Sequence, residues 1–509
     1  MTIKLPPAKS VAANPTQDAL KAMTSRMPNA QLTEFDNWHV KARVTARSGS
    51  STFVVTDVPG WTEKQSMPRA EYEAVAAMQD EHIASRDMIL VEGYIGPENS
   101  PVRVPARVYI DASFANIPAM QQQLYYPKDE DWGDDQAFTV IYTPDLPAPG
   151  YSGDRLIAID LQYWVTRVWN ADYFGESKMG ALRMWNEYVY QRGGLAMHAG
   201  AKVIPVEGGE KVCLIVGLSG TGKTTTTFTR QNNSLPVQDD FVALMPGGEV
   251  YSSEDGCFAK TFGLDPRQEP TIYRALTTPE GWLENVAVDQ RGGVDFFDGS
   301  YTANGRGTFK LSMIEHFDPR RVGKGDFLLI LNRNETIVPA VAKMASKEQA
   351  VAYFMLGETR GTSAGGATEA GRSLRIPGTN PFFLQYDYMQ GNRLGQLLES
   401  MDYGFEVYVL STGRIGGSKK VTIPHTSAIV KAIAERTIEW EPDPDFGYLT
   451  ATAVPGIDDP ELLQPRRLYQ RENRTQEYED SVEALKADRR VYMKQHEGLN
   501  QKYIDALNP

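Results

Sequence analysis

The chain has 509 residues, which is too long for one ordinary hydrophobic core and predicts at least two domains. Its formal net charge of -13 argues against a nucleic-acid partner and an anionic membrane surface, because no overall positive field attracts either one. Only two cysteines occur, so no disulfide framework is expected and the composition fits a reducing cytoplasm. We expect no signal peptide and no membrane span, because no sufficiently long apolar run is present.

The first 200 residues predict an N-terminal mixed α/β domain. We expect residues 1–30 to be a loosely ordered lead-in, because prolines recur there. Apolar residues with helical spacing predict a helix over residues 71–86. Short apolar runs predict strands at residues 53–55, 88–91, 108–110, 138–142 and 156–159.

Residues 201–509 predict a second, C-terminal domain of the α/β class. Strands are expected at residues 327–331 and 405–410, and helices at residues 346–356, 393–401 and 428–435. Ser346 and Gln349 have the spacing of a capping box at the start of the first of these helices. Residues 364–381 are rich in Gly, Ser, Thr and Pro and predict a long loop. The charged tail at residues 475–507 predicts one or two solvated surface helices.

The most specific pattern in the chain is GLSGTGKT at residues 217–224. It follows an apolar run at residues 212–216, and a helix is expected to begin near Lys223, so it matches a phosphate-binding loop in its proper strand–turn–helix context. Glycines let backbone N–H groups surround a polyphosphate, and the helix N-terminus adds a positive dipole. Lys223 can reach the β- and γ-phosphates, and the Thr224 hydroxyl can bind Mg²⁺. A chance glycine-rich turn is the less specific interpretation. The predicted ATP-binding residues are Gly217, Ser219, Gly220, Thr221, Gly222, Lys223, Thr224 and Thr225.

Two adjacent carboxylates, Asp239 and Asp240, follow a short apolar segment just after this loop and its helix. In phosphate-loop folds, a carboxylate at the end of a neighbouring strand holds Mg²⁺ directly or through water. An Asp pair on its own is usually part of a solvated turn. The position after the loop therefore favours a nucleotide–metal site, although many reactions use such a site.

Five motifs give the sequence a wider resemblance. They are YFGESKMG at residues 173–180, AMH at 196–198, GLSGTGKTT at 217–225, GCFAK at 256–260 and LENV at 283–286. Together they resemble the ATP-dependent phosphoenolpyruvate carboxykinases. The match is good over residues 173–306, weaker over residues 405–426 and thin before residue 173. It implies a two-domain fold with a substrate-side N-terminal domain (1–200) and a nucleotide- and metal-binding C-terminal domain (201–509). The implied reaction converts oxaloacetate and ATP into phosphoenolpyruvate, CO₂ and ADP.

The resemblance also implies roles for single residues. Arg47 and Arg306 would hold the substrate carboxylate and the developing charge, since the guanidinium fork suits carboxylates and phosphates. Lys178 would lie beside the enolate and the γ-phosphate, and Tyr173 would orient the departing carboxylate. The nucleotide would bind with Mg²⁺, and the residues beside it would be Lys260, Lys420 and Thr426. His198 and Asp240 would be ligands of Mn²⁺, and Asp239 would contact metal-bound water. Considered alone, Arg47 could be a solvated surface residue and His198 a buried structural histidine.

Three departures from the family pattern stand out. Met179 replaces the lysine whose uncharged amine binds the metal in the family, and a thioether is a poor ligand for Mn²⁺. Residues 49–52 read GSST where a lysine-rich stretch is expected, and Lys420 stands where arginine is usual. We therefore expect a weakened Mn²⁺ site: water could fill the vacant position, or the nucleotide and substrate could recruit the metal.

Two other functions remain open from the sequence. One is a phosphotransferase on the same scaffold that acts on another small acid or a protein hydroxyl, which Met179 favours. The other is a nucleotide-binding regulatory protein without turnover, which the intact Lys223, Thr224 and Asp240 disfavour. The expected partners are small molecules, and the oligomeric state is not determined by the sequence.

Overall fold

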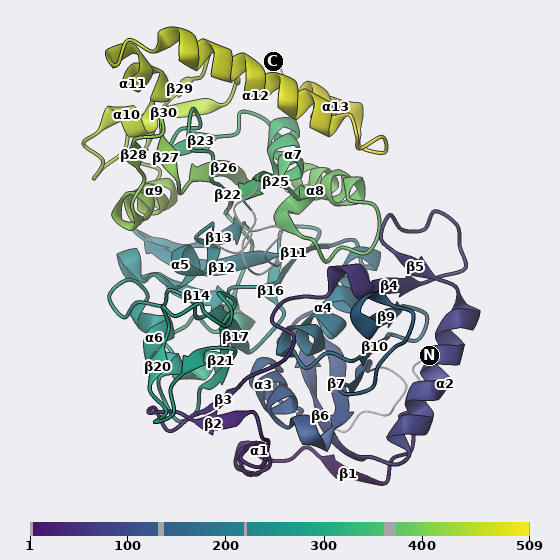
Figure 1. The fold of residues 1–509 in the computed structure, drawn as a ribbon. Coiled ribbons are helices and arrows are strands. Elements are labelled where there is room, and N and C mark those ends of the chain that lie inside the picture. Colours follow the sequence, from purple (N-terminus) through teal and green to yellow (C-terminus); the bar gives the residue numbers. More distant parts are fainter. Residues whose placement is uncertain (1–3, 131–136, 218–220, 361–372, 508–509) are drawn as a thin grey trace.

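Two eight-stranded mixed sheets organise the chain, one in each half (Figure 1). The structure is a computed structural model that describes residues 4–130, 137–217, 221–360 and 373–507. The mixed α/β class expected from the sequence is confirmed. Most of the predicted strands and helices lie within longer elements of the same type, because hydrophobic patterning marks the middle of an element better than its ends.

The N-terminal sheet is covered by helices that bury its alternating side chains. Its strands follow the order β1 (Ser10–Ala13), β6 (Asp87–Ile95), β7 (Val104–Asp111), β8 (Phe138–Thr143), β10 (Val165–Trp169), β9 (Leu156–Asp160), β4 (Thr52–Val55) and β5 (Ser66–Met67). The helices of this half are α1 (Gln17–Thr24), α2 (Arg69–Ile83), α3 (Asn116–Leu124) and α4 (Phe174–Gln191). Val140 faces α4 and α3, whereas its neighbour Ile141 faces the opposite side, as the two-residue period of a strand requires. Gly180 lets α4 lie directly on this sheet, because a Cβ there would come within 3.1 Å of Val140.

The expectation that residues 1–30 are loosely ordered is wrong. Strand β1 pairs in parallel with β6, and α1 begins after Thr16, whose hydroxyl accepts a hydrogen bond from the Ala19 N–H at 3.2 Å. Leu20 on this helix is fully buried. Prolines 6, 7 and 15 lie outside both elements, so they do not interrupt them.

The C-terminal sheet is buried on both faces. Its strands follow the order β14 (Leu235–Gln238), β12 (Ala199–Val206), β13 (Gly209–Val216), β22 (Phe327–Asn332), β26 (Glu406–Ser411), β23 (Val341–Lys343), β30 (Leu449–Ala453) and β29 (Glu439–Pro442). Leu214 and Val216 face α7 (Lys347–Leu356), α8 (Tyr388–Ser400), α12 (Thr475–Met493) and α13 (Gln501–Asp505). Cys213 and Ile215 face α9 (Ile423–Glu435), α10 (Pro460–Leu463) and α11 (Pro465–Arg471). Cys213 is therefore a small core residue, as the sequence predicts.

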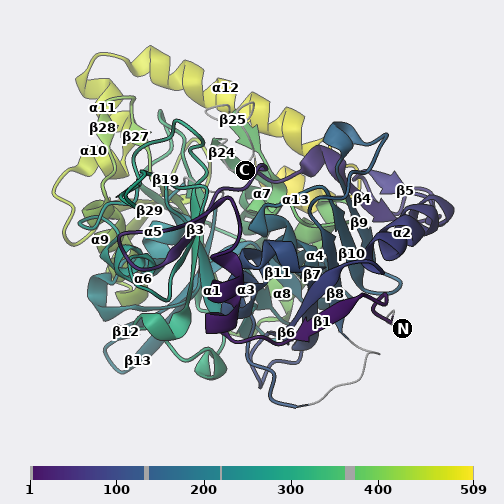
Figure 2. The ribbon, with the colours of Figure 1, turned by 60° about the horizontal axis from the view of Figure 1, so that its bottom comes forward.

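A third sheet joins the two halves of the chain. It has the order β17 (Gly256–Lys260), β21 (Arg306–Lys310), β18 (Trp282–Glu284), β3 (Trp38–Val40) and β2 (Ala30–Leu32). Strand β3 pairs in parallel with β18, so an N-terminal segment lies beside strands from the second half (Figures 1 and 2). The division of the chain at residue 200 stays a proposal, with this segment crossing it. A smaller sheet of β11 (Leu195–Met197), β15 (Val242–Leu244) and β16 (Val250–Ser252) packs between the large ones.

Two expectations about the C-terminal part need correction. Half of the predicted loop at residues 364–381 lies outside the described residues, but β25 (Ser373–Arg375) pairs with β24 (Glu358–Arg360) and is a strand rather than a loop. The tail is helical as predicted, but α12 is not simply a solvated surface helix. It lies against α7 along the top of Figure 1, and it buries Tyr478, Val482 and Met493.

Helix α12 also contributes a buried ion pair. The Arg489 guanidinium donates to both carboxylate oxygens of Glu358, from Nε at 2.8 Å and from Nη2 at 2.7 Å. Arg375 Nη1 lies 3.0 Å from the same carboxylate, and the side-chain amide of Asn332 at the end of β22 donates to it at 2.9 Å. Arg489 is 3% exposed, so α12 is tied to the core of the C-terminal half.

This pair predicts an acid-sensitive component of stability. Burial by itself would raise the pKa of Glu358, but Arg489 and Arg375 outweigh burial and lower that pKa to about 2. A depressed carboxylate pKa stabilises the fold above the unfolded-state pKa, and this contribution is lost as the pH falls towards 2. When the pH falls from 6 to 3, the free energy of unfolding should drop in both proteins. We expect the drop to be about 2 kcal/mol smaller in Glu358→Gln than in the wild type. Urea unfolding at both pH values measures this, with the exposed Glu497→Gln as the control. Equal losses in E358Q and wild type would contradict it.

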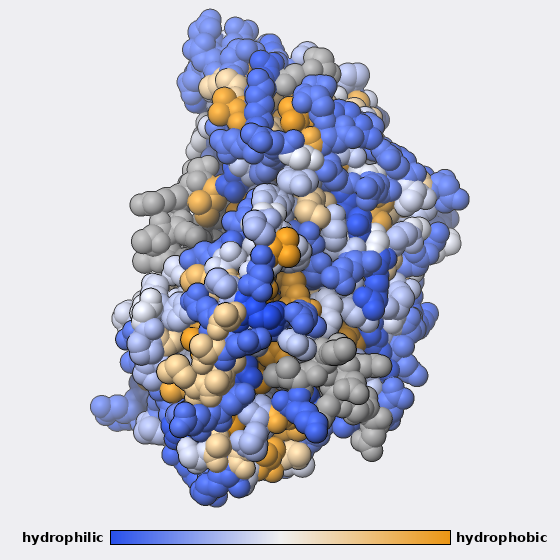
Figure 3. Space-filling view, turned by 90° about the vertical axis from the view of Figure 1, so that its right-hand side faces the viewer, coloured by the Kyte–Doolittle hydropathy of each residue, from blue (hydrophilic) through white to orange (hydrophobic). Residues whose placement is uncertain are grey.

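The described residues contain no helix that is both long enough and apolar enough to cross a membrane. Figure 3 shows one face of the molecule, which is largely hydrophilic with only small, separate apolar patches. This face therefore carries no broad apolar surface in the part that the structure describes.

Candidate active site

The phosphate-loop motif lies at the end of β13, in the middle of the C-terminal sheet. Gly217 follows the strand, and α5 (Lys223–Phe228) begins six residues later. Gly222 has a φ of +96°, a left-handed conformation that favours glycine, and it directly precedes Lys223. Leu218, Ser219 and Gly220 lie outside the described residues. The predicted strand and the predicted helix are therefore present on either side of these three residues.

Lys223 supplies a buried cation at the start of this helix. Lys223 as a whole is 5% exposed. Its side-chain amine has no hydrogen-bond partner among the described residues. Burial lowers the pKa of Lys223. Thr224, the second residue of α5, is half-buried. A buried amine without an acceptor, next to a helix N-terminus, fits an anion such as a polyphosphate.

Asp240 is the point at which three predicted site residues meet. Its Oδ2 lies 2.5 Å from Lys178 Nζ of α4, and its Oδ1 lies 2.9 Å from His198 Nε2. Oδ1 is also 3.7 Å from Lys223 Nζ. These residues come from α4, the β11–β12 junction and α5, so one carboxylate joins both halves of the chain to the phosphate loop.

The charges around Asp240 reinforce one another. Burial would raise the pKa of Asp240, but the charged Lys178 amine holds it well below its ordinary value. Burial would likewise lower the pKa of Lys178, but Asp240 and Glu254 raise it, so the amine stays charged. Burial and Lys223 lower the pKa of His198, which leaves a neutral imidazole. Buried Asp239 has a pKa raised to about 6 by burial and by Asp240.

A second cluster links the segment around Thr45 and Arg47 in the N-terminal half to residues at the start of β21. The Asn304 side-chain amide donates to the Thr45 carbonyl at 2.7 Å and to the Tyr173 hydroxyl at 3.3 Å. Arg306 Nη2 donates to the Asn304 oxygen at 2.9 Å. Arg306 opposes the rise in the pKa of Asp239, but burial and Asp240 outweigh it. Asn304 thus holds Tyr173 and Arg306 together beside the Thr45 backbone.

Two more predicted site residues, Arg47 from the substrate side and Lys260 from the nucleotide side, lie beside these clusters. Arg47 is half-buried, with its guanidinium 5.7 Å from the centre of the Phe382 ring, and the same ring packs edge-on against His198. Lys260 on β17 lies directly opposite Arg306 on β21. Burial and Arg306 lower the pKa of Lys260 to about 8. Arg47 is thus near the Asp240 cluster, and Lys260 is beside Arg306 rather than on the cavity described next.

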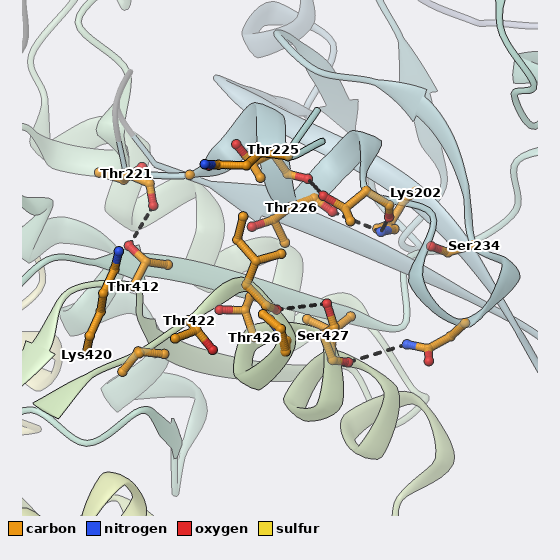
Figure 4. Close-up of a pocket in the computed structure, with 18 of the residues that line it drawn as sticks. Lys202, Thr221, Thr225, Thr226, Ser234, Thr412, Lys420, Thr422, Thr426 and Ser427 are labelled. Atoms are coloured by element: carbon orange, nitrogen blue, oxygen red, sulfur yellow. Dashed lines mark hydrogen bonds between the residues drawn. The ribbon is translucent and has the colours of Figure 1, made fainter. Parts of the chain in front are cut away.

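A cavity of about 360 Å³ extends from the phosphate loop towards α9 (Figure 4). Its walls are hydroxyl-rich and carry three cationic side chains, and its described lining residues include no Asp or Glu. The predicted nucleotide residues on its wall are Thr221, Gly222, Thr225, Lys420 and Thr426. The hydroxyl of Thr412 on the opposite wall donates to the Thr221 carbonyl at 2.7 Å. Such a cationic, hydroxyl-lined cavity beside a phosphate loop fits a nucleotide.

Comparison with known proteins decides the family. The model of the family described as phosphoenolpyruvate carboxykinase matches residues 9–460. This chain belongs to the phosphoenolpyruvate carboxykinase family. A protein named phosphoenolpyruvate carboxykinase (ATP) from Mesorhizobium japonicum is 29% identical over 447 residues, which cover 84% of this chain and 81% of the relative. Proteins of the same name are 28% identical in Aeropyrum pernix, with 81% and 82% covered, and 30% identical in Lysinibacillus sphaericus, with 76% and 74% covered.

Use of a divalent metal is a property of the carboxykinase family, and the residues present fit a cation. His198 Nδ1 lies 2.9 Å from the Thr379 carbonyl, which can only accept, so this nitrogen carries the proton. The Nε2 lone pair then faces the Asp240 carboxylate, an arrangement that a cation stabilises. Asp239 Oδ1 is buried without a described hydrogen-bond partner. Met179 is instead packed in the core of the N-terminal half, which leaves His198 and Asp240 as the side chains here that could hold a cation.

A different trio of possible ligands lies far from this site in the sequence. Among the described residues, the only group of three close His, Cys, Asp or Glu side chains is His82, Asp111 and Asp145. Arg86 already donates to His82 Nε2 at 3.0 Å and to Asp145 at 2.7 Å. A guanidinium thus occupies the place of a cation there, and the group is an ion-pair cluster.

Sequence reasoning missed several residues of the carboxykinase site. Glu254 accepts a hydrogen bond from Lys178 and is fully buried, and burial raises its pKa to about 7. Its position two residues before the GCFAK motif was the available signal. Asn304 is two residues before the predicted Arg306, but its bonds to Thr45 and Tyr173 depend on tertiary structure. Thr379 and Phe382 contact His198 but carried no signal, since Thr379 lies within the predicted loop at residues 364–381 and Phe382 directly follows it.

Proposed function

We propose that this member of the carboxykinase family converts oxaloacetate and ATP into phosphoenolpyruvate, CO₂ and ADP. The observation that carries the proposal is the convergence of Lys178, His198 and Lys223 on Asp240. This places a phosphate-loop lysine, a neutral imidazole and a charged amine around one carboxylate. The family membership supports the same reaction.

The chain's own residues suit each step of this reaction. Arg306 and Arg47 would bind the carboxylate of oxaloacetate, and Tyr173 would orient the carboxylate that leaves as CO₂. When the C–C bond to the departing carboxylate breaks, its electron pair forms an enolate with the negative charge on the former carbonyl oxygen. The Lys178 ammonium stabilises this enolate. The enolate oxygen then forms a bond to the γ-phosphorus as the bond to the ADP oxygen breaks.

The nucleotide side would be held by the phosphate loop and the cavity. Lys223 and the α5 N-terminus would bind the phosphates, and Thr426 and Lys420 would line the rest of the nucleotide. Mg²⁺ at Thr224 and Mn²⁺ at His198 and Asp240 would add positive charge at the phosphate and enolate oxygens when bound. A cytoplasmic location is part of the proposal and accords with two free, buried cysteines.

Transfer of phosphate to another small acid or a protein hydroxyl is not favoured. The relatives compared above all carry the name phosphoenolpyruvate carboxykinase (ATP), and Tyr173 and Arg306 lie together as the carboxykinase reaction requires. Met179 therefore points to altered metal binding rather than to another substrate.

The decisive experiment runs the reaction in reverse. Purified protein receives phosphoenolpyruvate, ADP, bicarbonate and Mn²⁺, and the oxaloacetate formed is followed through its enzymatic reduction by NADH. We expect turnover well above that of a Lys223→Ala variant. Turnover equal to that of this variant, with both Mn²⁺ and Mg²⁺, would overturn the proposal.

Restoring the family's lysine should strengthen metal binding. In Met179→Lys we expect the affinity for Mn²⁺ without nucleotide to rise about tenfold, because a third protein ligand joins His198 and Asp240. Titration of free Mn²⁺ by electron paramagnetic resonance measures this. Met179→Leu is the matched control, since it keeps the volume without adding a ligand, and its affinity should stay at the wild-type value. If M179K binds Mn²⁺ no more tightly than M179L does, the hypothesis that Met179 leaves one ligand position vacant is contradicted.

A further inference from the structure

Lys202 is a buried lysine whose amine binds the end of the phosphate-loop helix. It lies on β12, four residues after His198, and is 2% exposed. Its Nζ donates to the carbonyl oxygens of Thr226 and Thr229, both at 2.9 Å. Thr226 belongs to the last turn of α5 and Thr229 is the residue after the helix, so Lys202 satisfies two carbonyls that the helix itself leaves free.

Helix α5 needs such an anchor because it is short. It has six residues, so its C-terminal end lies only about 9 Å from the N-terminus that carries Lys223. A helix of this length has little stability of its own, and a cation at its C-terminus also interacts favourably with its dipole. Strand β12 packs directly against α5 at Gly200, where a Cβ would clash with the Thr227 side chain. The direction of α5 therefore depends on what holds its far end.

In the part of the chain that the structure describes, no ion pair compensates the burial of the Lys202 charge. Across the described residues, no carboxylate forms an ion pair with it. Burial lowers the pKa of Lys202 to about 8, so the amine is charged at neutral pH although the burial disfavours that charge. The two hydrogen bonds to the helix end only partly offset the desolvation of this unpaired charge. A residue whose charge opposes folding is a candidate for a role in function.

Lys202 also lines the nucleotide cavity, together with Thr225 and Thr226 of α5 (Figure 4). We propose that Lys202 is a positioning residue for the nucleotide: it holds the last turn of α5 and so directs Lys223 and the helix N-terminus at the phosphates. This inference rests on the proposed use of ATP by this site.

The test separates nucleotide binding from stability. In Lys202→Met we expect the affinity for ATP, measured by calorimetry with Mg²⁺, to fall about tenfold, because two charge-assisted hydrogen bonds to the helix end are lost. The Tm of the unliganded protein should stay within about 2 °C of wild type, because removal of the desolvated charge offsets the loss of the two hydrogen bonds. In the assay of oxaloacetate decarboxylation, the KM for ATP should rise about tenfold while the KM for oxaloacetate stays unchanged.

Two further variants make the result specific. Lys202→Arg keeps the charge and the donors beside a cavity that can take the larger group, and it should bind ATP more tightly than K202M. Lys211→Met removes a lysine of the neighbouring strand that pairs with Asp326 outside the cavity, and it should bind ATP as the wild type does. Wild-type ATP affinity in K202M would overturn the proposal, as would a large fall in Tm with equal rises in both KM values. Wild-type protein that binds ATP without turnover would remove the proposed reaction and leave the role of Lys202 standing.

Discussion

Replacing Lys223 with alanine should lower kcat/KM for carboxykinase turnover by about a thousandfold, the scale seen when a single phosphate- or oxyanion-stabilising group is removed. Its amine is buried at the start of α5 with no described hydrogen-bond partner, and it lies 3.7 Å from Asp240. The loss should appear mainly in kcat, because charge on the transferring phosphoryl group is greatest in the transition state. Steady-state kinetics in the reverse direction measures both parameters.

A folding defect is excluded by two comparisons. The Tm of Lys223→Ala should stay close to that of the wild type, because its 3.7 Å ion pair with Asp240 is long and Asp240 keeps its closer contacts with Lys178 and His198. Lys343→Ala removes a lysine that pairs with Glu406 on the same sheet, away from the cavity, and it should retain full kcat. Residual activity of K223A within tenfold of wild type would show that phosphate binding does not depend on this residue.

Replacing Arg489 with methionine should lower the free energy of unfolding by about 3 kcal/mol, the lower end of the cost of breaking a buried pair. The variant leaves the Glu358 carboxylate and the Tyr353 hydroxyl without the guanidinium that binds both. The expected cost is at the lower end because Arg375 still lies 3.0 Å from Glu358. Urea unfolding at pH 7 measures the difference.

The double variant distinguishes the ion pair from simple packing. The double variant Glu358→Gln/Arg489→Met removes both charges of the pair, so neither is left buried without the other. Its loss of free energy of unfolding should therefore be smaller than the sum of the losses in the two single variants. Arg471→Met is the matched control, since Arg471 pairs with Glu461 at a half-exposed position and should change stability by less than about 0.5 kcal/mol. Strict additivity, or an R489M loss no larger than that of R471M, would show that α12 is held by apolar contacts alone.

The phosphate loop and most of the secondary structure could be predicted from the sequence because both depend on neighbouring residues. The turn before Lys223 needs glycine at Gly222, and the strand before it needs only a continuous apolar run. Family resemblance extended the prediction to Lys178, His198 and Asp240, which the fold brings together. The lead-in at residues 1–30 was misjudged, because the partner of β1 is β6, more than 70 residues later.

What the amino-acid sequence determined by itself is therefore the local chemistry: a polyphosphate cradle, an adjacent pair of carboxylates and the missing metal-binding lysine at Met179. Only the tertiary structure decided which distant groups satisfy one another. Glu254 meets Lys178, Asn304 meets Thr45, and Lys202 meets the end of α5 because strand order sets these contacts. No periodicity or spacing along the chain encodes such pairs, since a buried polar group can be satisfied by any partner that packing brings within hydrogen-bond distance.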